Sequence, residues 1–342
     1  GKIVVRNNNI KNGRIDFSSP SYTDDEHYQQ RIKRATPQGG DIIITREAPM
    51  GEVGMIPEGI VCCLGQRMVL LRANPDICDN YYLLYSLQSR YVQHQISWSE
   101  GTGTTVSNLR IPHLEQLKIP YLPLSKQRQV SSVLRCLEEK IKHNRVINDN
   151  LQQQAQAIYA SMFVDNAEPT WKQGHLSDFV IVRYGKDHKK LADGIYPVYG
   201  SGGIMRHVER PLYDKESVLI PRKGTLNNVM YVNQPFWSVD TMFYTEMRQP
   251  NVAKFVYHFV KAKDLASMNA GSAVPSMTTD ILNAMEIVIP PASVLEEFES
   301  LVAPMYRAMQ ENDAQSKKLA DLRNALLPKL MSGEIDVSDI QL

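Results

Sequence analysis

The chain contains 342 residues, of which 43% are hydrophobic and 22% are charged, and its formal net charge is +1. This length and composition predict two globular domains with cores of their own, and they fit neither a disordered nor a membrane protein. The near-neutral total excludes a histone-like polyelectrolyte but is compatible with a local basic patch.

The sequence contains neither a targeting signal nor a metal-binding motif. Charged residues interrupt the apolar runs before these reach the roughly 18 residues that a membrane span needs, and residues 1–10 lack a signal-peptide layout. The four cysteines form neither a CxxC pair nor a zinc-like spacing with histidine, so we expect reduced thiols. These features predict a cytoplasmic protein without membrane segments.

The first third of the chain, residues 1–123, predicts a mixed α/β domain. Lys2–Arg6 and Asp41–Thr45 are predicted strands, and the Asn12-Gly13 dipeptide is a hairpin signal. Apolar residues recur at helical spacing over Asn80–Trp98, which predicts one amphipathic helix after the strands.

Two long segments, residues 124–164 and 292–332, each show apolar residues at alternating steps of four and three, which is a heptad pattern. The first seam contains Val130, Leu134, Leu137, Ile141, Asn144, Asn148, Leu151, Ala155, Ile158 and Met162. The second contains Phe298, Val302, Met305, Met309, Asn312, Ser316, Leu319, Arg323, Leu326 and Leu330. Because both seams are interrupted by polar residues at the same two steps, the segments are predicted to pair as helices.

The polar seam positions predict the register of this helix pair. In an antiparallel arrangement Asn144 would face Ser316, and Asn148 would face Asn312. Buried amides of this kind fix register and orientation at some cost in stability. The alternative is that the seam shifts to residues 146–147, which would leave the amides on the surface.

The remaining residues complete the predicted organisation. Residues 165–291 are a second mixed domain, and residues 333–342 are a C-terminal tail. Pro304 and Pro328 lie within the second long helix, where their missing N–H groups predict kinks or a break.

The order of motifs in the first domain recurs in the second. DIIITREAPMGEVGMI from Asp41 aligns with SVLIPRKGTLNNVMYV from Ser217. GTTVSNLRIPHLEQLKIPYLP from Gly103 aligns without a gap with GSAVPSMTTDILNAMEIVIPP from Gly271. The chain is therefore predicted to be a duplication, in the order domain, helix, domain, helix, rather than an array of short repeats.

Several of these stretches resemble the DNA specificity subunit of type I restriction-modification systems. They are the prolines before each helix, NALLPKLMSGEI from Asn324, and YPVYGSGGIMRHVERPLYDKESVLIPRKGTLNNVMYVNQPFWSVDTMFY from Tyr196. The resemblance covers nearly the whole chain and implies an α+β fold. Two mixed α/β target recognition domains in tandem would be separated by two long helices, which form an antiparallel coiled coil with pseudo-two-fold symmetry. Trp171–Gly194 has no counterpart in the first domain, whose Gly1 aligns near Ile195, so we expect that domain to lack its start.

The resemblance also implies a function. It predicts a non-catalytic subunit, without a cofactor or metal of its own, that reads a bipartite target in double-stranded DNA. Two methyltransferase subunits and the restriction and translocase subunits would be its partners, and these would use S-adenosylmethionine, ATP and Mg. The sequence contains no NPP[FY] loop, no GK[ST] phosphate cradle and no HExxH motif. The alternative is a coiled-coil scaffold whose duplicated domains bind proteins and read no DNA.

DNA reading needs basic side chains for phosphates, and amide, hydroxyl or basic side chains for base edges. In the first domain the candidates are Arg6, Asn7, Asn8, Asn9, Lys11, Arg14, Arg46, Thr104 and Thr105. In the second they are Ser201, Arg206, His207, Arg222, Lys223, Asn227, Asn228 and Ser272. Arg46 and Arg222 are equivalent in the repeat, which favours both. An ordinary surface or turn residue is the alternative for each candidate.

Overall fold

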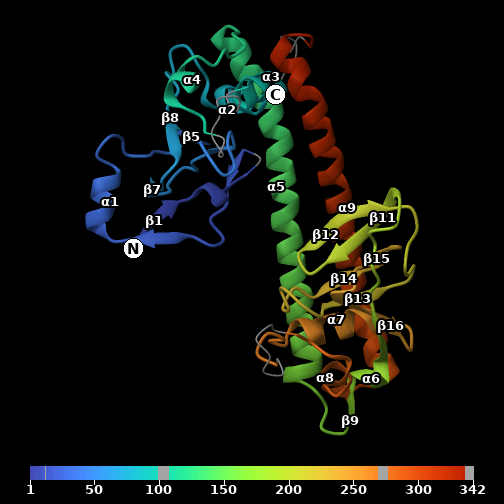
Figure 1. The fold of residues 1–342 in the computed structure, drawn as a ribbon. Helices are drawn as coiled ribbons and strands as arrows, with labels where there is room; N and C mark the ends of the chain where they lie inside the picture. Colours follow the sequence, from blue (N-terminus) through green and yellow to red (C-terminus); the bar gives the residue numbers. More distant parts are fainter. Residues whose placement is uncertain (12, 99–107, 269–275, 336–342) are drawn as a thin grey trace. The chain divides into compact units, whose positions relative to one another are not determined.

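The computed structural model describes residues 1–11, 13–98, 108–268 and 276–335. Internal contacts divide the chain into two units, of which the first comprises Gly1–Asn144 and Asp313–Leu342 and the second Arg145–Asn312. The boundary therefore falls inside both long helices, α5 (Leu124–Ala160) and α9 (Ala292–Ser332), which Figure 1 shows in green and red. The predicted division into five segments stays a prediction.

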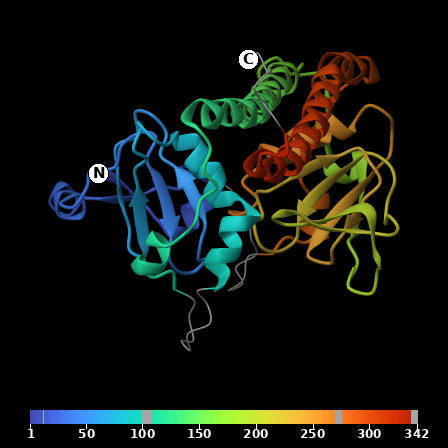
Figure 2. The same ribbon diagram turned by 90° about the horizontal axis from the view of Figure 1, so that it is seen from above.

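The described part of the first unit contains two three-stranded sheets and a strand pair (Figures 1 and 2). The first sheet has the order β4 (Ser21–Thr23), β1 (Lys2–Val5) and β7 (Cys62–Leu64), with β1 antiparallel to β4 and parallel to β7. The second, antiparallel sheet has the order β6 (Val53–Met55), β5 (Ile42–Thr45) and β8 (Met68–Leu71). The pair consists of β2 (Ile10–Lys11) and β3 (Arg14–Ile15). Short helices in this unit are η1 (Asn7–Asn9), α1 (Asp25–Arg31) and α4 (Ile111–Glu115).

The single helix predicted over Asn80–Trp98 is wrong, because this stretch forms α2 (Asn80–Gln88) and α3 (Arg90–Ser97). Ser89 separates them with an extended backbone, at ψ 148°. Its Oγ donates to the Ser86 carbonyl oxygen at 2.6 Å and accepts the Val92 N–H at 3.3 Å. A serine that bonds to nearby backbone groups competes with helix continuation and caps the next helix.

The second unit repeats this plan with longer strands. One sheet has the order β10 (Val180–Tyr184), β16 (Met242–Met247), β13 (Ser217–Pro221) and β14 (Met230–Val232). A second has the order β12 (Gly203–Val208), β11 (Asp193–Gly200) and β15 (Trp237–Ser238), and β9 (Lys172–His175) pairs with β17 (Glu286–Ile289). The helices are η3 (Ser161–Asp165), α6 (Leu176–Phe179), α7 (Ala253–Lys261) and α8 (Thr279–Asn283).

The two units share their strand register, which confirms the predicted duplication. The β5–β8 pair places Ile44 opposite Val69, and the β13–β16 pair places Ile220 opposite Phe243. Likewise, β1 runs parallel to β7 in the first unit, as β11 runs parallel to β15 in the second. The fold is thus α+β, with the same mixed domain present twice.

Within each unit the segments of α5 and α9 pack antiparallel. In the first unit the Asn144 Nδ2 donates to Ser316 Oγ at 3.1 Å and to Gln315 Oε1 at 2.8 Å. In the second unit the Asn312 Nδ2 donates to Asn148 Oδ1 at 2.8 Å. The structure therefore brings together both residue pairs that the heptad pattern places opposite each other.

The exposed faces of the long helices explain two further observations. Val146 and Ile147 are 57% and 43% exposed, so the seam does not shift to them.

The break predicted in the second helix is not found, because α9 continues through Pro304 and Pro328. Both prolines are exposed, and water can therefore bond the carbonyl groups that a proline leaves without an N–H partner.

An aromatic core in the second unit surrounds a buried histidine. His258 is 0% exposed, and its ring stacks at 5.7 Å from the ring of Tyr159. Its Nδ1 bonds to Gln156 Oε1 at 2.8 Å, and its Nε2 bonds to the Tyr306 hydroxyl at 2.9 Å. Burial lowers the pKa of His258 to about 4, so the folded unit holds this imidazole neutral.

We expect the second unit to lose stability as the pH falls from 7 to 4. The His258 pKa is about 4 when folded and returns to its ordinary 6.5 on unfolding, so the unfolded chain takes up a proton that the folded chain excludes. The stability is fully present above pH 6.5 and is lost as the pH falls through this window, by about 3 kcal/mol. Urea unfolding followed by hydrogen exchange in α7 measures the loss, and His258→Phe should flatten the dependence. An unchanged slope in that variant would assign the loss to other groups.

No helix in the described ranges is both long enough and apolar enough to cross a membrane.

Candidate nucleic-acid interface

The same three chain segments meet in each unit. They are the turn after β1 or β11, the loop after the central strand, β5 or β13, and the residues that follow the undescribed segment, 108–109 or 276–277. The Leu109 N–H donates to the Arg46 carbonyl oxygen at 2.9 Å, and the Met277 N–H donates to the Arg222 carbonyl oxygen at 2.9 Å. Arg46 and Arg222 therefore occupy equivalent positions in the folded repeats.

In the first unit the Arg46 guanidinium bonds within the protein. Its Nε donates to the Leu109 carbonyl oxygen at 2.8 Å, and its Nη2 donates to Asn108 Oδ1 at 3.1 Å. Glu47 in turn accepts from Asn108 Nδ2 at 2.6 Å and pairs with Arg67 at 3.2 Å. We conclude that Arg46 positions Asn108 and Leu109, which leaves fewer of its N–H groups for a ligand.

Two of the predicted asparagines hold the first turn in place. The Asn7 Nδ2 donates to the Glu47 carbonyl oxygen at 2.6 Å, and the Asn9 side chain accepts the Arg6 N–H at 2.8 Å. Arg14 is half-buried and lines a separate hollow of about 400 Å³. Among the candidates of this unit that the structure describes, Arg6, Asn8 and Lys11 have exposed side chains.

In the second unit Arg222 and Lys223 follow β13 directly. The Arg222 Nη1 donates to the Asp240 carbonyl oxygen at 3.2 Å, and the guanidinium lies 5.6 Å from the ring centre of Tyr184. Lys223 is exposed, and its backbone forms a bridge with Ser276, next to the undescribed segment. A supported arginine and an exposed lysine are thus neighbours at the end of the central strand.

The hairpin turn between β11 and β12 packs against the same loop. The Asn228 Nδ2 donates to the Ser201 carbonyl oxygen at 2.8 Å, which ties the two segments together. Gly224 is required here, because its φ is +85° and a Cβ would lie 2.5 Å from Ser201 Oγ. His207, further along β12, is exposed.

Arg206 and Asn227 form internal contacts instead. The Arg206 Nη2 donates to Asp193 Oδ1 at 2.8 Å and to the Leu191 carbonyl oxygen at 2.9 Å. The Asn227 Nδ2 donates to Asp264 Oδ1 at 2.9 Å, and this bond lowers the pKa of Asp264. Both side chains therefore stabilise their own unit.

Three predicted contacts, Thr104, Thr105 and Ser272, lie outside the described residues, as does Asn12 of the hairpin signal. Two residues of this region, Asn108 and Tyr184, were not predicted from the sequence. Asn108 follows the predicted threonines within the same repeated segment, so the repeat alignment could have indicated it. Tyr184 lies in a segment without a repeat counterpart, and no sequence signal pointed to it.

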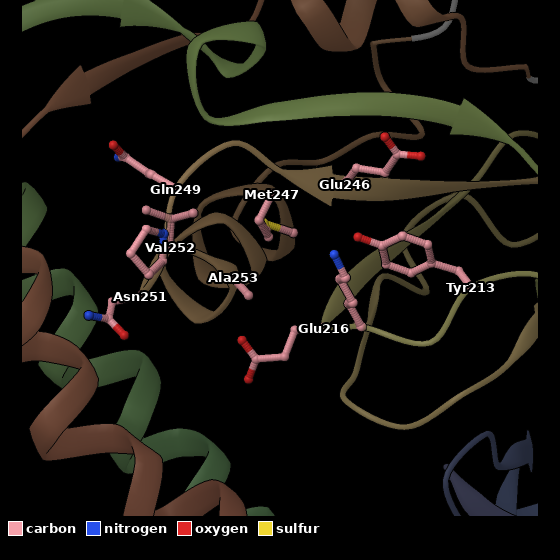
Figure 3. Close-up of a pocket in the computed structure, with 10 residues that line it drawn as sticks. Tyr213, Glu216, Glu246, Met247, Gln249, Asn251, Val252 and Ala253 are labelled. Atoms are coloured by element: carbon pink, nitrogen blue, oxygen red, sulfur yellow. The ribbon is translucent and has the colours of Figure 1, made fainter.

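A hollow of about 560 Å³ lies elsewhere in the second unit, beside the end of β16 and the start of α7 (Figure 3). Figure 3 shows that Tyr213, Glu216 and Glu246 line it. Glu216 Oε1 accepts from the Tyr231 hydroxyl and from Lys254 Nζ, the latter at 3.1 Å. Carboxylates repel phosphate groups, so this hollow does not suit DNA.

We define the candidate reading surface of the second unit as Ser201, Arg222, Lys223 and Asn228. Its lysine and arginine can neutralise phosphates, and its amide and hydroxyl groups can bond to base edges. The guanidinium of Arg222 lies over the ring of Tyr184, which is 51% exposed, and this cation–π contact supports the arginine. The described ranges contain no cluster of three or more side chains that could ligate a metal ion.

Comparison with known proteins adds a family relation. Residues 1–153 and 168–297 match the family described as Type I restriction modification DNA specificity domain. The MjaIX type I restriction enzyme specificity subunit of Methanocaldococcus jannaschii is 23% identical, over 88% of this chain and 79% of its own length. A putative type I specificity subunit of Mycoplasma genitalium is 24% identical, over 75% and 70%. The crystal structure of a type I restriction-modification S subunit from M. genitalium shares the fold, with a TM-score of 0.58 at 18% identity, over 86% of this chain and 83% of that one.

Proposed function

Because the chain belongs to the family of type I restriction modification DNA specificity domains, we propose that it reads the DNA target for a type I restriction-modification complex. Each unit reads one half of a bipartite sequence in double-stranded DNA. The observation that carries this proposal is the repeated loop cluster. In the first unit the Arg46 carbonyl oxygen accepts the Leu109 N–H, and in the second the Arg222 carbonyl oxygen accepts the Met277 N–H. Two copies of one reading domain suit a target with two separate halves.

In the second unit, different residues of the reading surface provide affinity and specificity. Lys223 and Arg222 bind phosphates, which positions the unit on the duplex without selecting a sequence. In this proposal Asn228 and Ser201 contact base edges, because an amide and a hydroxyl can discriminate between them. The bond between these two residues holds both segments before DNA arrives, which reduces the entropy lost on binding.

The chain acts without chemistry of its own in this proposal. Methylation and restriction belong to partner subunits, namely two methyltransferase subunits and the restriction and translocase subunits. S-adenosylmethionine, ATP and Mg are used by those partners. Support comes from the names of the relatives, which are specificity subunits of type I systems.

Sequencing the methylated adenines of cells that carry this chain and its partner subunits tests the proposal. We expect a split motif with a fixed gap, which disappears when the gene for this chain is deleted. A contiguous motif, or methylation that survives the deletion, would contradict a bipartite reader.

Salt dependence separates DNA reading from the scaffold alternative. A reader assembled with its methyltransferase should bind one sequence selectively, and its affinity should fall steeply as salt rises, because phosphate binding releases counterions. A protein scaffold predicts neither property. Titrating labelled duplexes at several salt concentrations measures both.

A further inference from the structure

Two apolar side chains are exposed next to the turn of the hairpin that β11 and β12 form (Figure 1). Ile204 and Met205, which are neighbours in sequence, are 54% and 61% exposed. The strand pairing places Val198 opposite Arg206 and Tyr199 opposite Ile204. The residue between them in β12 is therefore a β-bulge, with no residue opposite it in β11. A bulge disrupts the alternation of side chains between the two faces of a strand and changes the direction of a side chain.

A glycine on the facing strand makes room for the Met205 side chain. A Cβ on Gly200 would lie 2.6 Å from Met205 Sδ and 3.3 Å from its Cγ, so the thioether packs directly on the backbone of β11. Gly200 itself is buried. Single exposed apolar residues are ordinary on protein surfaces, but here a bulge and a glycine position two of them at one turn. A side chain supported in this way loses less conformational entropy when a ligand covers it.

The turn between β11 and β12 belongs to the reading surface. Within the turn, the Ser201 carbonyl oxygen accepts the Asn228 Nδ2 at 2.8 Å. Just before the turn, the Tyr199 carbonyl oxygen accepts the Val239 N–H at 3.1 Å. The carbonyl oxygen of the residue after Val239 accepts from Arg222 Nη1 at 3.2 Å. The apolar pair is therefore joined to the groups that bind phosphates in the proposed function.

The chemistry of the pair limits what it can recognise on a duplex. Isoleucine and methionine carry no charge to neutralise a phosphate, and a thioether is only a weak hydrogen-bond acceptor. In the major groove thymine presents an apolar group, its C5 methyl, whereas the groups by which the other bases are read are hydrogen-bond donors and acceptors. An apolar pair beside phosphate-binding cations therefore fits a thymine methyl.

The first unit differs at the equivalent positions. The parallel strand pairs β1–β7 and β11–β15 align the two turns, so that Ile10 corresponds to Ile204 and Lys11 to Met205. Ile10 is buried, at 2% exposure, and Lys11 is exposed. A lysine can bind a phosphate or a guanine, but its ammonium group does not suit a methyl group. We therefore expect methyl recognition in only one of the two half-sites.

We propose that Ile204 and Met205 contact the C5 methyl of a thymine in the half-site that the second unit reads. This inference rests on the proposed function and names the side chains that read one base pair. Arg222 and Lys223 position the hairpin through phosphates, and the apolar pair selects the base pair by burying its methyl group.

Replacing single thymines of the target by deoxyuridine tests the proposal, because deoxyuridine lacks only the C5 methyl. The probe is the duplex that methylation sequencing identifies, and the protein is the full chain assembled with its methyltransferase subunits. We expect replacements in one half-site to weaken binding roughly fourfold, which is the effect of burying one methyl group. In the double variant Ile204→Ala and Met205→Ala the same replacement should change nothing, because the contact is already lost. Fluorescence anisotropy measures both affinities.

Ile195→Ala is the matched control. Ile195 lies on β11 at the other end of the hairpin and is 78% exposed, so its truncation removes no core contact. This variant should keep the fourfold effect of deoxyuridine.

The outcomes separate this inference from the proposed function. Selective binding that no replacement weakens would overturn the inference and leave the proposed function intact. An effect that persists in the double variant, or that Ile195→Ala also removes, would do the same. Absence of sequence-selective binding by the assembled complex would overturn both.

Discussion

The substitution Lys223→Glu is expected to weaken DNA binding by the assembled complex about 10- to 100-fold at moderate salt. Lys223 is exposed beside Arg222, at the end of the central strand of the second unit. Reversing its charge removes one phosphate contact and adds repulsion, so the slope of log affinity against log salt should also fall by about 1 to 2. Because phosphate contacts carry no sequence information, the methylated motif itself should be unchanged.

Lys215→Glu is the matched control for this change. Lys215 is also exposed and precedes β13, whereas Lys223 follows it, and it lines the acidic hollow beside Glu216. The two variants have the same net charge, so a general electrostatic effect would weaken binding equally in both. Equal losses of DNA affinity in the two variants would show that Lys223 does not contact DNA. A loss confined to Lys223→Glu would assign the phosphate contact to the reading surface. Titration of one labelled target duplex at three salt concentrations provides the comparison.

The substitution Phe298→Ala is expected to destabilise the second unit by about 3–5 kcal/mol. The Phe298 side chain is 0% exposed, and its ring lies 5.2 Å from that of Phe163 and 6.2 Å from that of Tyr159. Truncation removes these contacts and leaves a cavity between α9 and α5 that rigid neighbouring rings cannot fill. Urea unfolding, with hydrogen exchange in α7 as the readout, measures the change.

Leu301→Ala on the same helix is the control. Leu301 is 47% exposed, so its truncation should alter the free energy of unfolding by no more than about 0.5 kcal/mol. If both variants lost similar stability, neither core packing at Phe298 nor helix propensity would be the cause. Alanine is the best helix former, so a propensity effect would favour both changes.

The tandem fold could be predicted because its signals lie along the chain itself. The heptad spacing that contains Asn144 and Asn148 depends only on helical periodicity, and it recurs with Asn312 and Ser316 in the second seam. The duplication followed from aligned segments whose strands do share a register. The interruption at Ser89 was missed, because apolar spacing continues across a residue whose side chain bonds locally and ends the helix.

The candidate site could be predicted only at the level of its segments. The sequence indicated the loop after each central strand, and the structure does bring these loops together with the first turn of each unit. The sequence did not indicate which of the side chains in these segments point toward solvent. Arg206 was predicted as a contact but bonds to Asp193 on the neighbouring strand, a partner set by an irregular register between β11 and β12.

The sequence by itself determined the order of domains and helices, the two heptad seams and the loops that form the candidate interface. These follow from periodicity and repetition, which are properties of the chain in one dimension. The tertiary structure alone decided that Arg46 bonds to Leu109 and that Tyr184 supports Arg222. Hydrogen-bond partners and buried surfaces depend on which distant segments pack together, and that is fixed only when the chain has folded.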